Sequence, residues 1–417
     1  MRRIEAVIIG GGQSGLALSR CLTDVGIEHV VLERGEVGER WRRASWDSLR
    51  LLTPRWQARL PGWSYQGDDP DGYMDWRETV GYLEGFARSF PAPIVTGVSV
   101  TSVRRHAGRF IVDTTSGAWR ADHVVIATGD CQQTRRPPFA GRLPGDIVQM
   151  DPTRYRNPRD LPDGGVLVVG ASSTGVQLAN EIHASGRAVT MSVGRHTRLP
   201  RTYRGTDILW WLDRMGVLGE RADQVPDLET SRQQPSLQLV GTPERRTLDL
   251  RQLIRAGVRL VGRAVDASGD TVHFDDALVE ATVAADVKMA RLLERIERFI
   301  EAEGLVEGLS PADDFEPTPF LDAPARLDLA AEGIRSVVWA TGYRRDYGWL
   351  HAPALDAEGE IMHAGGVTPV PGLYVLGLRF LRRRKSSFID GAADDARDLT
   401  THIVTRRMAN RSARAVA

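Results

Sequence analysis

Two stretches of the chain share one pattern, and together they decide the fold. Residues 5–26 read EAVIIGGGQSGLALSRCLTDVG, and residues 161–182 read LPDGGVLVVGASSTGVQLANEI. Each places a short apolar run before a loop of small residues and a helical pattern after it. This order is typical of the first β-turn-α unit of a dinucleotide-binding fold. We therefore expect an α/β protein with two Rossmann-like dinucleotide-binding domains.

The first loop, residues 10–15, has glycine at its first, third and last positions and so matches G-x-G-x-x-G. These glycines permit a tight turn, a close approach of the backbone to a pyrophosphate, and close packing of helix on strand. The next apolar run ends in Glu33, whose carboxylate can accept hydrogen bonds from ribose hydroxyls. A plain tight turn would explain the glycines but not Glu33. This unit is therefore predicted to bind FAD, whose adenosine ribose carries no phosphate.

The second loop, residues 170–175, keeps the first and last glycines but has Ser172 at the middle position. Its second apolar run, residues 188–193, is followed by arginines instead of an acid. An arginine pairs with a 2′-phosphate that an acid would repel, so this unit is predicted to prefer NADPH. The alternative is that these arginines are solvated loop residues. The residues expected to bind NADPH are Gly170, Ser172, Ser173, Thr174, Gly175, Arg195, Arg198, Thr341 and Gly342.

Composition narrows the class of protein. The chain has 417 residues, and 54 Lys and Arg balance 54 Asp and Glu, so two domains are expected and a nucleic-acid partner is not. Only Cys21 and Cys131 occur, without a C-x-x-C pair, which fits a reducing compartment and argues against a disulfide reductase. We see no apolar run that could serve as a signal peptide or a membrane span, and no metal-ligand cluster. A cytoplasmic protein is expected.

Strand and turn signals set the expected domain limits. Residues 94–129 are predicted to form a β-meander that ends in an A-T-G motif, and a Pro-, Gly- and Arg-rich linker follows. A second A-T-G motif at 340–342 is expected to return the chain to the first domain. We expect an FAD-binding domain formed by residues 1–160 and 338–417, and an inserted NADPH-binding domain formed by residues 161–337. The amphipathic pattern at 277–303 predicts a packing helix.

The last part of the chain suggests a further flavin contact. Residues 372–378 are predicted to be a strand, and Asp390-Gly391 is predicted to open a helix. The positive end of that helix would stabilise the reduced flavin. Between them lies the basic cluster of residues 382–385, which is either a solvated loop or a contact to a phosphate or an anionic substrate.

These motifs resemble, in the same order, those of the class B flavin-dependent monooxygenases, which include flavin-containing, Baeyer–Villiger and N-hydroxylating enzymes. The resemblance covers most of the chain and includes both glycine loops, both A-T-G motifs and the DGAADDA ending. It implies that Trp41, Thr53 and Val100 line the FAD and that the turn at Thr128 holds it. The residues expected to bind FAD are Gly10, Gly12, Gln13, Ser14, Gly15, Glu33, Arg34, Trp41, Thr53, Val100, Ala127, Thr128, Gly129, Asp390 and Gly391.

The interdomain linker departs from the family pattern F-x-G-x-x-x-H-x-x-x-aromatic. Phe139-Ala140-Gly141 and Tyr155 lie farther apart than this pattern requires, and the position four before Tyr155 is Asp151 instead of His. In the family, that His helps to organise the linker and the movement of NADPH. Its replacement argues against efficient monooxygenation more than against cofactor binding, and it supports a flavin oxidase or reductase as the alternative.

The resemblance implies an NADPH-dependent FAD monooxygenase that transfers one oxygen atom of O2 to a small organic substrate through a (hydro)peroxyflavin. Arg55 is a candidate for contacting flavin or substrate, although no acid or base is assigned. One alternative is an NADPH-dependent flavin oxidase or reductase that produces H2O2 or passes electrons to a partner. Another is a non-enzymatic flavin redox sensor, with the helix at 277–303 and the basic cluster as its binding surfaces. A homodimer is the default assembly.

Overall fold

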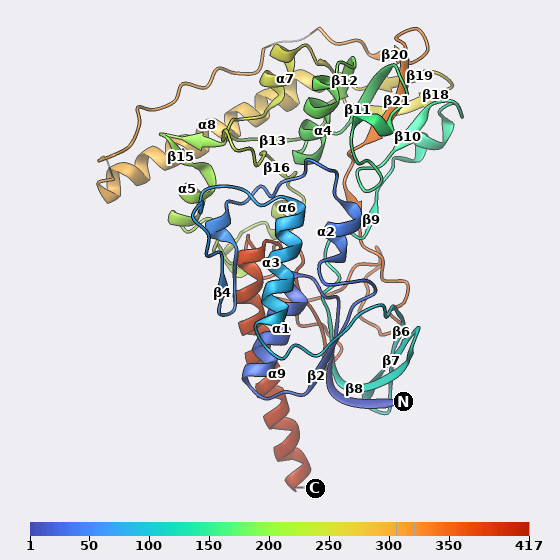
Figure 1. The fold of residues 1–417 in the computed structure, drawn as a ribbon, viewed down its shortest axis with the longest axis vertical. Coiled ribbons are helices and arrows are strands. Elements are labelled where there is room, and N and C mark those ends of the chain that lie inside the picture. Colours follow the sequence, from blue (N-terminus) through green and yellow to red (C-terminus); the bar gives the residue numbers. More distant parts are fainter. Residues whose placement is uncertain (306, 320–321, 417) are drawn as a thin grey trace.

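The computed structural model describes residues 1–305, 307–319 and 322–416, and it consists of two α/β domains stacked along the long axis of the molecule (Figure 1). The first glycine loop and the C-terminal helix lie in one domain. The second glycine loop and the long amphipathic helix lie in the other. The predicted fold class is therefore confirmed.

The first domain is built on a seven-stranded sheet of order β5-β2-β1-β8-β7-β6, with β23 also paired to β8. β1 (Arg2–Ile9) lies between β2 (His29–Leu32) and β8 (Gly117–Ile126) and runs parallel to both. Residues 6–9 are apolar because both faces of this strand are buried. The remaining strands are β5 (Ile94–Val95), β6 (Val100–His106), β7 (Arg109–Thr114) and β23 (Leu373–Val375).

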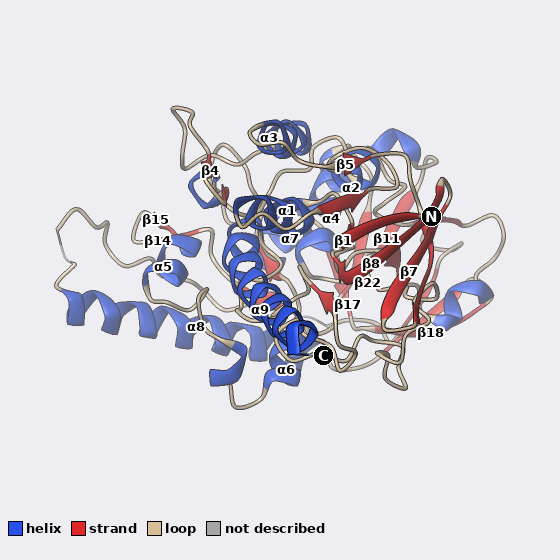
Figure 2. Cartoon of the chain, turned by 90° about the horizontal axis from the view of Figure 1, so that it is seen from below, coloured by secondary structure: helices blue, strands red, loops and turns tan. Residues whose placement is uncertain are grey.

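Helices from both ends of the chain pack together in this domain. α1 (Gln13–Asp24) packs against α9 (Ile389–Val416), and α3 (Trp76–Arg88) also contacts α1 (Figure 2). The predicted meander is present as β6, β7 and β8. The predicted last strand and the helix at Asp390 are present as β23 and α9. Shorter elements here are α2 (Glu39–Ala44), η1 (Arg55–Gln57), β3 (Arg59–Leu60) and β4 (Trp63–Ser64).

The second domain is built on a five-stranded parallel sheet of order β10-β21-β11-β12-β17. Helix α4 follows the central strand β11, just as α1 follows β1 in the first domain. The sheet and this helix are β10 (Val148–Met150), β21 (Ile334–Trp339), β11 (Gly165–Val169), β12 (Val189–Ser192), β17 (Arg259–Val261) and α4 (Ser173–Ala184). Around them lie α7 (Leu250–Ala256), β18 (Ala264–Ser268), β19 (Thr271–Phe274) and β20 (Arg326–Asp328).

The predicted packing helix is α8 (Leu278–Glu303). Its buried side chains, which include Met289, Leu293 and Ile296, share a hydrophobic cluster with Trp211 of α5 (Ile208–Arg214). The Trp211 indole is fully buried and donates to the Tyr203 carbonyl at 3.0 Å, as core packing requires. Among the described residues, no helix is long and apolar enough to cross a membrane.

The sheets shift one domain boundary from its predicted place. β10 pairs with β21, so residues 148–150 belong to the second sheet and not to the first domain. The chain crosses between domains at β9 (Gln133–Thr134) and returns at β22 (Tyr343–Arg344), and these two strands pair antiparallel. The first boundary therefore lies near the paired crossing strands instead of at residue 160. The sequence did not show this because a three-residue strand inside a Pro- and Gly-rich linker has no pattern of its own.

Candidate functional site

The first glycine loop forms a cradle whose glycines have different tasks. Gly10 has a φ of +114°, and a Cβ there would come within 2.5 Å of the Ala127 carbonyl oxygen. A Cβ on Gly15 would overlap the carbonyl of Gly10. By contrast, no atom lies within 4 Å of the place that a Cβ on Gly12 would take. Two of the glycines are thus required by packing, and the third leaves a space that fits a pyrophosphate at the N-terminus of α1.

Glu33 lies at the end of β2, beside this cradle, as predicted. Its carboxylate is buried and accepts hydrogen bonds from the backbone N–H groups of Gly11 at 2.6 Å and Gly35 at 3.0 Å. These two bonds fix the side chain, and each carboxylate oxygen keeps a lone pair for a ribose hydroxyl. Neighbouring Arg34 is exposed.

The second glycine loop is built in the same way. Gly170 has a φ of +111°, and a Cβ there would overlap the Ala340 carbonyl, while a Cβ on Gly175 would overlap the carbonyl of Gly170. Ser172 takes the place of Gly12 as the residue before the helix. The two A-T-G motifs therefore play matching roles, because each supplies the alanine carbonyl on which the first glycine of a cradle packs.

Two glutamines that the sequence reading missed support the second cradle. Gln238 is fully buried on β16 (Leu237–Gln238), and its Nε2 donates to the Ala171 carbonyl at 2.6 Å. Gln177 donates to the Ser173 hydroxyl at 3.0 Å and to the Leu239 carbonyl at 3.2 Å. No motif marks these residues, because only the folded chain brings residues 237–239 to the loop.

The two predicted phosphate-binding arginines have opposite environments. Arg195 follows β12 and is exposed. Arg198 is buried, and its guanidinium donates to Asp249 at 2.7 Å and to Asp286 at 2.6 Å. Burial lowers the pKa of Arg198, but these carboxylates outweigh it and raise the pKa above its usual range. Arg198 is therefore part of a buried ion-pair cluster and does not fit the predicted role of a phosphate ligand, whereas Arg195 does.

The second A-T-G motif ties together the two crossing segments. The Thr341 hydroxyl donates to the Arg135 carbonyl, and the Arg135 N–H donates to the Gly342 carbonyl at 2.9 Å. In the first motif, the Thr128 hydroxyl accepts a hydrogen bond from Gln132 at 2.7 Å. Thr341 and Gly342 thus hold the connection between the domains, next to the cradle that Ala340 completes.

The start of α9 is fixed by ion pairs. Asp390 is buried and contacts the Arg59 Nε at 2.6 Å and the Lys385 Nζ at 2.7 Å. A Cβ on Gly391 would overlap the Lys385 carbonyl, so the glycine is required there by packing. The N-terminus of α9 is thus held by these contacts, and Asp390 itself is occupied.

The basic cluster at 382–385 is neutralised within the chain. Arg383 pairs with Asp395 at 2.8 Å and with Asp398 at 2.9 Å, and Arg384 pairs with Glu220. Such a network anchors the loop on α9 and does not fit the suggested contact to a phosphate or an anionic substrate. It is not a solvated loop either.

Arg55, the candidate for contacting flavin or substrate, is also paired with carboxylates. Its guanidinium donates to Asp69 and to Glu78, each at 2.6 Å, and so ties η1 to α3. This position does not support contact with flavin or substrate. The residues that the resemblance places around FAD are partly buried: Trp41 on α2, Thr53 before η1 and Val100 at the start of β6.

The structure shows what occupies the linker position at which this chain departs from the family pattern. Asp151 is buried and accepts two hydrogen bonds from Arg136, at 2.8 and 2.7 Å. Tyr155 is fully buried and donates to Glu181 at 3.0 Å. A salt bridge therefore takes the position that the family pattern gives to His.

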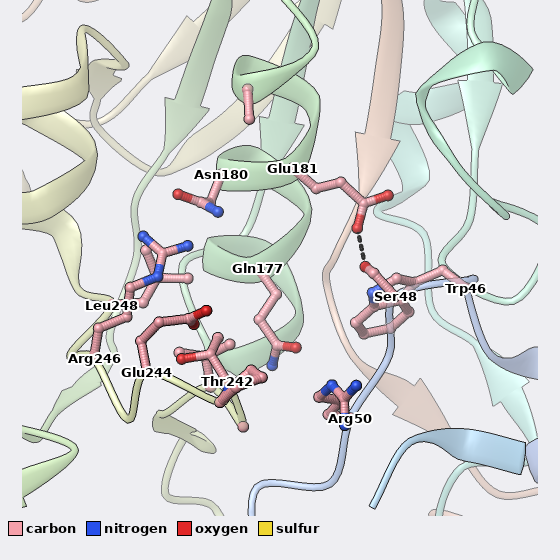
Figure 3. Close-up of a pocket in the computed structure, with 14 residues that line it drawn as sticks. Trp46, Ser48, Arg50, Gln177, Asn180, Glu181, Thr242, Glu244, Arg246 and Leu248 are labelled. Carbon is pink, nitrogen blue, oxygen red and sulfur yellow. Dashed lines mark hydrogen bonds between the residues drawn. The ribbon is translucent and has the colours of Figure 1, made fainter. Parts of the chain in front are cut away.

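A pocket of about 350 Å³ lies between the domains (Figure 3). One wall is formed by residues 46–50 of the first domain, and the others by α4 and the loop 240–248 of the second. The Ser48 hydroxyl donates to Glu181 across the opening. A second pocket of about 290 Å³ shares Arg50 and Pro243 with it.

Sequence comparison places the chain among oxidoreductases. Residues 7–212 match the family described as pyridine nucleotide-disulphide oxidoreductase. A CzcO-like oxidoreductase from Geobacillus kaustophilus is 32 % identical over 405 residues, which are 96 % of this chain and 98 % of that protein. The probable indole-3-pyruvate monooxygenase YUCCA9 of Arabidopsis thaliana is 30 % identical over 211 residues, 48 % of this chain and 49 % of that protein.

Structural comparison agrees with the resemblance seen in the motifs. A flavin-containing monooxygenase from Stenotrophomonas maltophilia has a TM-score of 0.66 at 18 % identity, covering 97 % of this chain and 99 % of that one. An ornithine N-hydroxylase from a Kutzneria species has a TM-score of 0.62 at 17 % identity, and the match covers 97 % of this chain and 100 % of that one. The chain therefore has the two-domain fold of these flavoproteins, and its overall identity to the Geobacillus protein shows that it belongs to the family of CzcO-like oxidoreductases.

Proposed function

We propose that the protein is an NADPH-dependent FAD monooxygenase that inserts one oxygen atom from O2 into a small organic substrate. One observation carries this proposal: the chain contains two cradles of matching construction, which end in residues of opposite charge. Glu33 follows the second strand of the first cradle, and Arg195 follows that of the second. This pair of sites suits one cofactor with a bare ribose and one with a 2′-phosphate.

The compared proteins support the choice of cofactors and reaction. The Kutzneria hydroxylase is described with reduced FAD and NADP+ bound, and the plant relative is a probable indole-3-pyruvate monooxygenase. We propose that residues before β9 and after β22 hold FAD, and that the segment between them holds NADPH.

FAD, when bound, supplies the two-electron and oxygen chemistry, and the chain supplies binding and orientation. Glu33 would hold the adenosine ribose, and the N-terminus of α1 would bind the pyrophosphate in the open space beside Gly12. In the second domain the N-terminus of α4 takes the other pyrophosphate, and Arg195 pairs with the 2′-phosphate. The N-terminus of α9 favours negative charge on the flavin.

The linker favours one second candidate, an NADPH-dependent flavin oxidase or reductase that releases H2O2 or passes electrons to a partner. The Asp151–Arg136 salt bridge occupies the position of the family His and ties the linker to itself. A linker held in this way would hinder the movement of NADPH that monooxygenation needs.

The two functions differ in the fate of oxygen. We would supply NADPH and ¹⁸O2 to the purified protein with a panel of ketones, amines, sulfides and aromatic 2-oxo acids. A monooxygenase yields a product carrying ¹⁸O, and H2O2 per NADPH falls below one when the right substrate is present. One H2O2 per NADPH with every substrate, and no labelled product, would instead identify an oxidase.

A further inference from the structure

The interdomain pocket of Figure 3 is distinct from both glycine cradles. Its α4 residues, Gln177, Asn180 and Glu181, lie one to two turns beyond the cradle at the start of the helix. Trp46, on the other wall, belongs to the first domain by sequence but packs in the hydrophobic core of the second. The pocket therefore exists only while the two domains are in contact.

Gly241 fixes the loop that forms one wall. A Cβ on Gly241 would overlap the Leu51 carbonyl of the first domain and would approach the Tyr73 Cβ to 2.8 Å. The loop is pressed against the first domain without space for a side chain. The shape of the pocket is consequently set by both domains and not by a freely moving loop.

Some charged groups around the pocket have close partners within the protein, and others do not. Glu181 is occupied, because one carboxylate oxygen accepts from Ser48 and the other from Tyr155. Arg50 donates to the Tyr73 carbonyl at 2.9 Å, and the nearest carboxylate oxygen paired with it, on Glu78, is 4.0 Å away. That same glutamate already binds Arg55 at 2.6 Å. Arg50 therefore offers a guanidinium that no close carboxylate neutralises.

The opposite side of the pocket has a different character. Arg246 and Glu244 both lie there, away from Arg50 (Figure 3), and neither forms an ion pair within the part of the chain that the structure describes. Because Arg246 and Glu244 carry opposite charges, together they add no net charge to this side of the pocket, and Glu244 repels an acid group placed there. A ligand of the pocket is thus expected to carry one acid group, at Arg50, and not two.

Apolar side chains line the space between these ends. Trp46, Val240 and Leu248 contribute to the lining, and the volume of about 350 Å³ is at the lower end of the range for small-molecule sites. A phosphate would need more positive charge than Arg50 supplies, because Glu244 offsets the charge of Arg246 in the same lining. A carboxylate attached to a ring or a short chain matches both the Arg50 guanidinium and the apolar walls.

We propose that this pocket is a binding site for a small amphipathic monocarboxylate, with the acid group on Arg50 and the apolar part against Trp46, Val240 and Leu248. Because both domains form the walls, the bound carboxylate favours the arrangement in which the two domains are in contact.

Isothermal titration calorimetry of the holoenzyme with 3-phenylpropanoate tests the site, and 3-phenylpropanamide serves as the uncharged analogue. We expect saturable binding of the acid and at least tenfold weaker binding of the amide. Arg50→Gln should weaken binding of the acid at least tenfold, since it removes the charge-assisted pair. Arg246→Gln, on the opposite side, should change it less than threefold, and so should Arg291→Gln on the remote exposed face of α8.

Val240→Trp provides an independent test from the other domain, because it fills the pocket without touching a charge. It should abolish binding of the acid while FAD content and melting temperature stay as in the wild type. The proposal is overturned if the wild type shows no saturable binding of the acid. It is equally overturned if correctly folded Arg50→Gln and Val240→Trp both bind the acid as tightly as the wild type.

Discussion

Arg195 and Arg198 stand three positions apart, yet only one of them is available to a ligand. Arg195 is exposed at the end of β12, whereas Arg198 is consumed by Asp249 and Asp286. Arg198, on β13 (Thr197–Arg198), thus serves folding, and we propose that Arg195 serves the choice of cofactor. Burial and partners, and not sequence spacing, separate the two roles.

Substitution of each arginine should affect a different property. Arg195→Gln is expected to weaken NADPH binding by about 10- to 100-fold and leave NADH binding unchanged, because it removes a charge-assisted contact worth about 1.5–3 kcal/mol. Arg198→Gln leaves two carboxylates without their partner in a buried site and should lower the free energy of unfolding by about 3–5 kcal/mol. Nicotinamide titrations and urea unfolding of both variants measure this. Equal NADPH affinity in wild type and Arg195→Gln would contradict the assignment.

Gln57 is a residue whose removal should help folding. It is almost completely buried on η1, and neither atom of its amide has a hydrogen-bond partner in the structure. Gln57→Leu should raise the free energy of unfolding by about 1–3 kcal/mol, because it removes the cost of an unsatisfied polar group. Gln177→Leu is the matched control and should destabilise, since that amide makes two hydrogen bonds. A loss of stability in Gln57→Leu would show that its amide has a partner in the working protein.

At the scale of elements, the two β-turn-α units follow from local patterns. Apolar runs, glycine spacing and helical periodicity lie within about 25 consecutive residues in such a unit, so the sequence alone predicts them. The meander, β23, α8 and the start of α9 were predicted for the same reason. By contrast, β10 and the Gln238 contact depend on residues more than 60 positions apart, and no local pattern reports them.

In the first cradle, the open space at Gly12 allows a test of where the pyrophosphate binds. Gly12→Ala has room for its methyl group in the protein itself, so the cofactor-free protein should unfold as the wild type does. The methyl group would occupy the space of the pyrophosphate, and FAD binding should weaken at least tenfold. Gly81→Ala in α3 is the control, because it also has open space but lies outside the cradle. Unchanged FAD affinity in Gly12→Ala would contradict the placement of the phosphate.

At the scale of the whole molecule, the roles of some site residues can be predicted from the sequence, whereas the roles of others cannot. Glu33 and the glycines are where the motifs place them, because each motif is completed by its own strand and helix. Arg198 was predicted to bind a phosphate, Arg55 was a candidate contact to flavin or substrate, and an anion contact was one of two interpretations of the basic cluster at 382–385. The fold instead gives each of them carboxylate partners from other elements. Partners of this kind are a property of the complete fold.

Buried His123 and half-buried His363 should make stability depend on pH. Burial lowers the pKa of His123 and of His363 from the ordinary 6.5 to about 4. Between these values the unfolded chain binds more protons than the folded one, so stability falls as the pH falls from about 6.5 toward 4. His123→Gln should make this decline less steep. Melting temperatures of both proteins between pH 7 and 4.5 measure it, and identical slopes would rule out the contribution of His123.

The central claim is that the first cradle holds FAD, the second holds NADPH, and a hydride passes between them. Anaerobic stopped-flow reduction of the bound flavin tests this most directly, with NADPH and NADH compared in the wild type and in Arg195→Gln. We predict that NADPH reduces the flavin much faster than NADH at limiting concentrations, and that the substitution removes this difference. Failure of both nicotinamides to reduce the flavin, or an NADPH preference that persists without Arg195, would contradict the account.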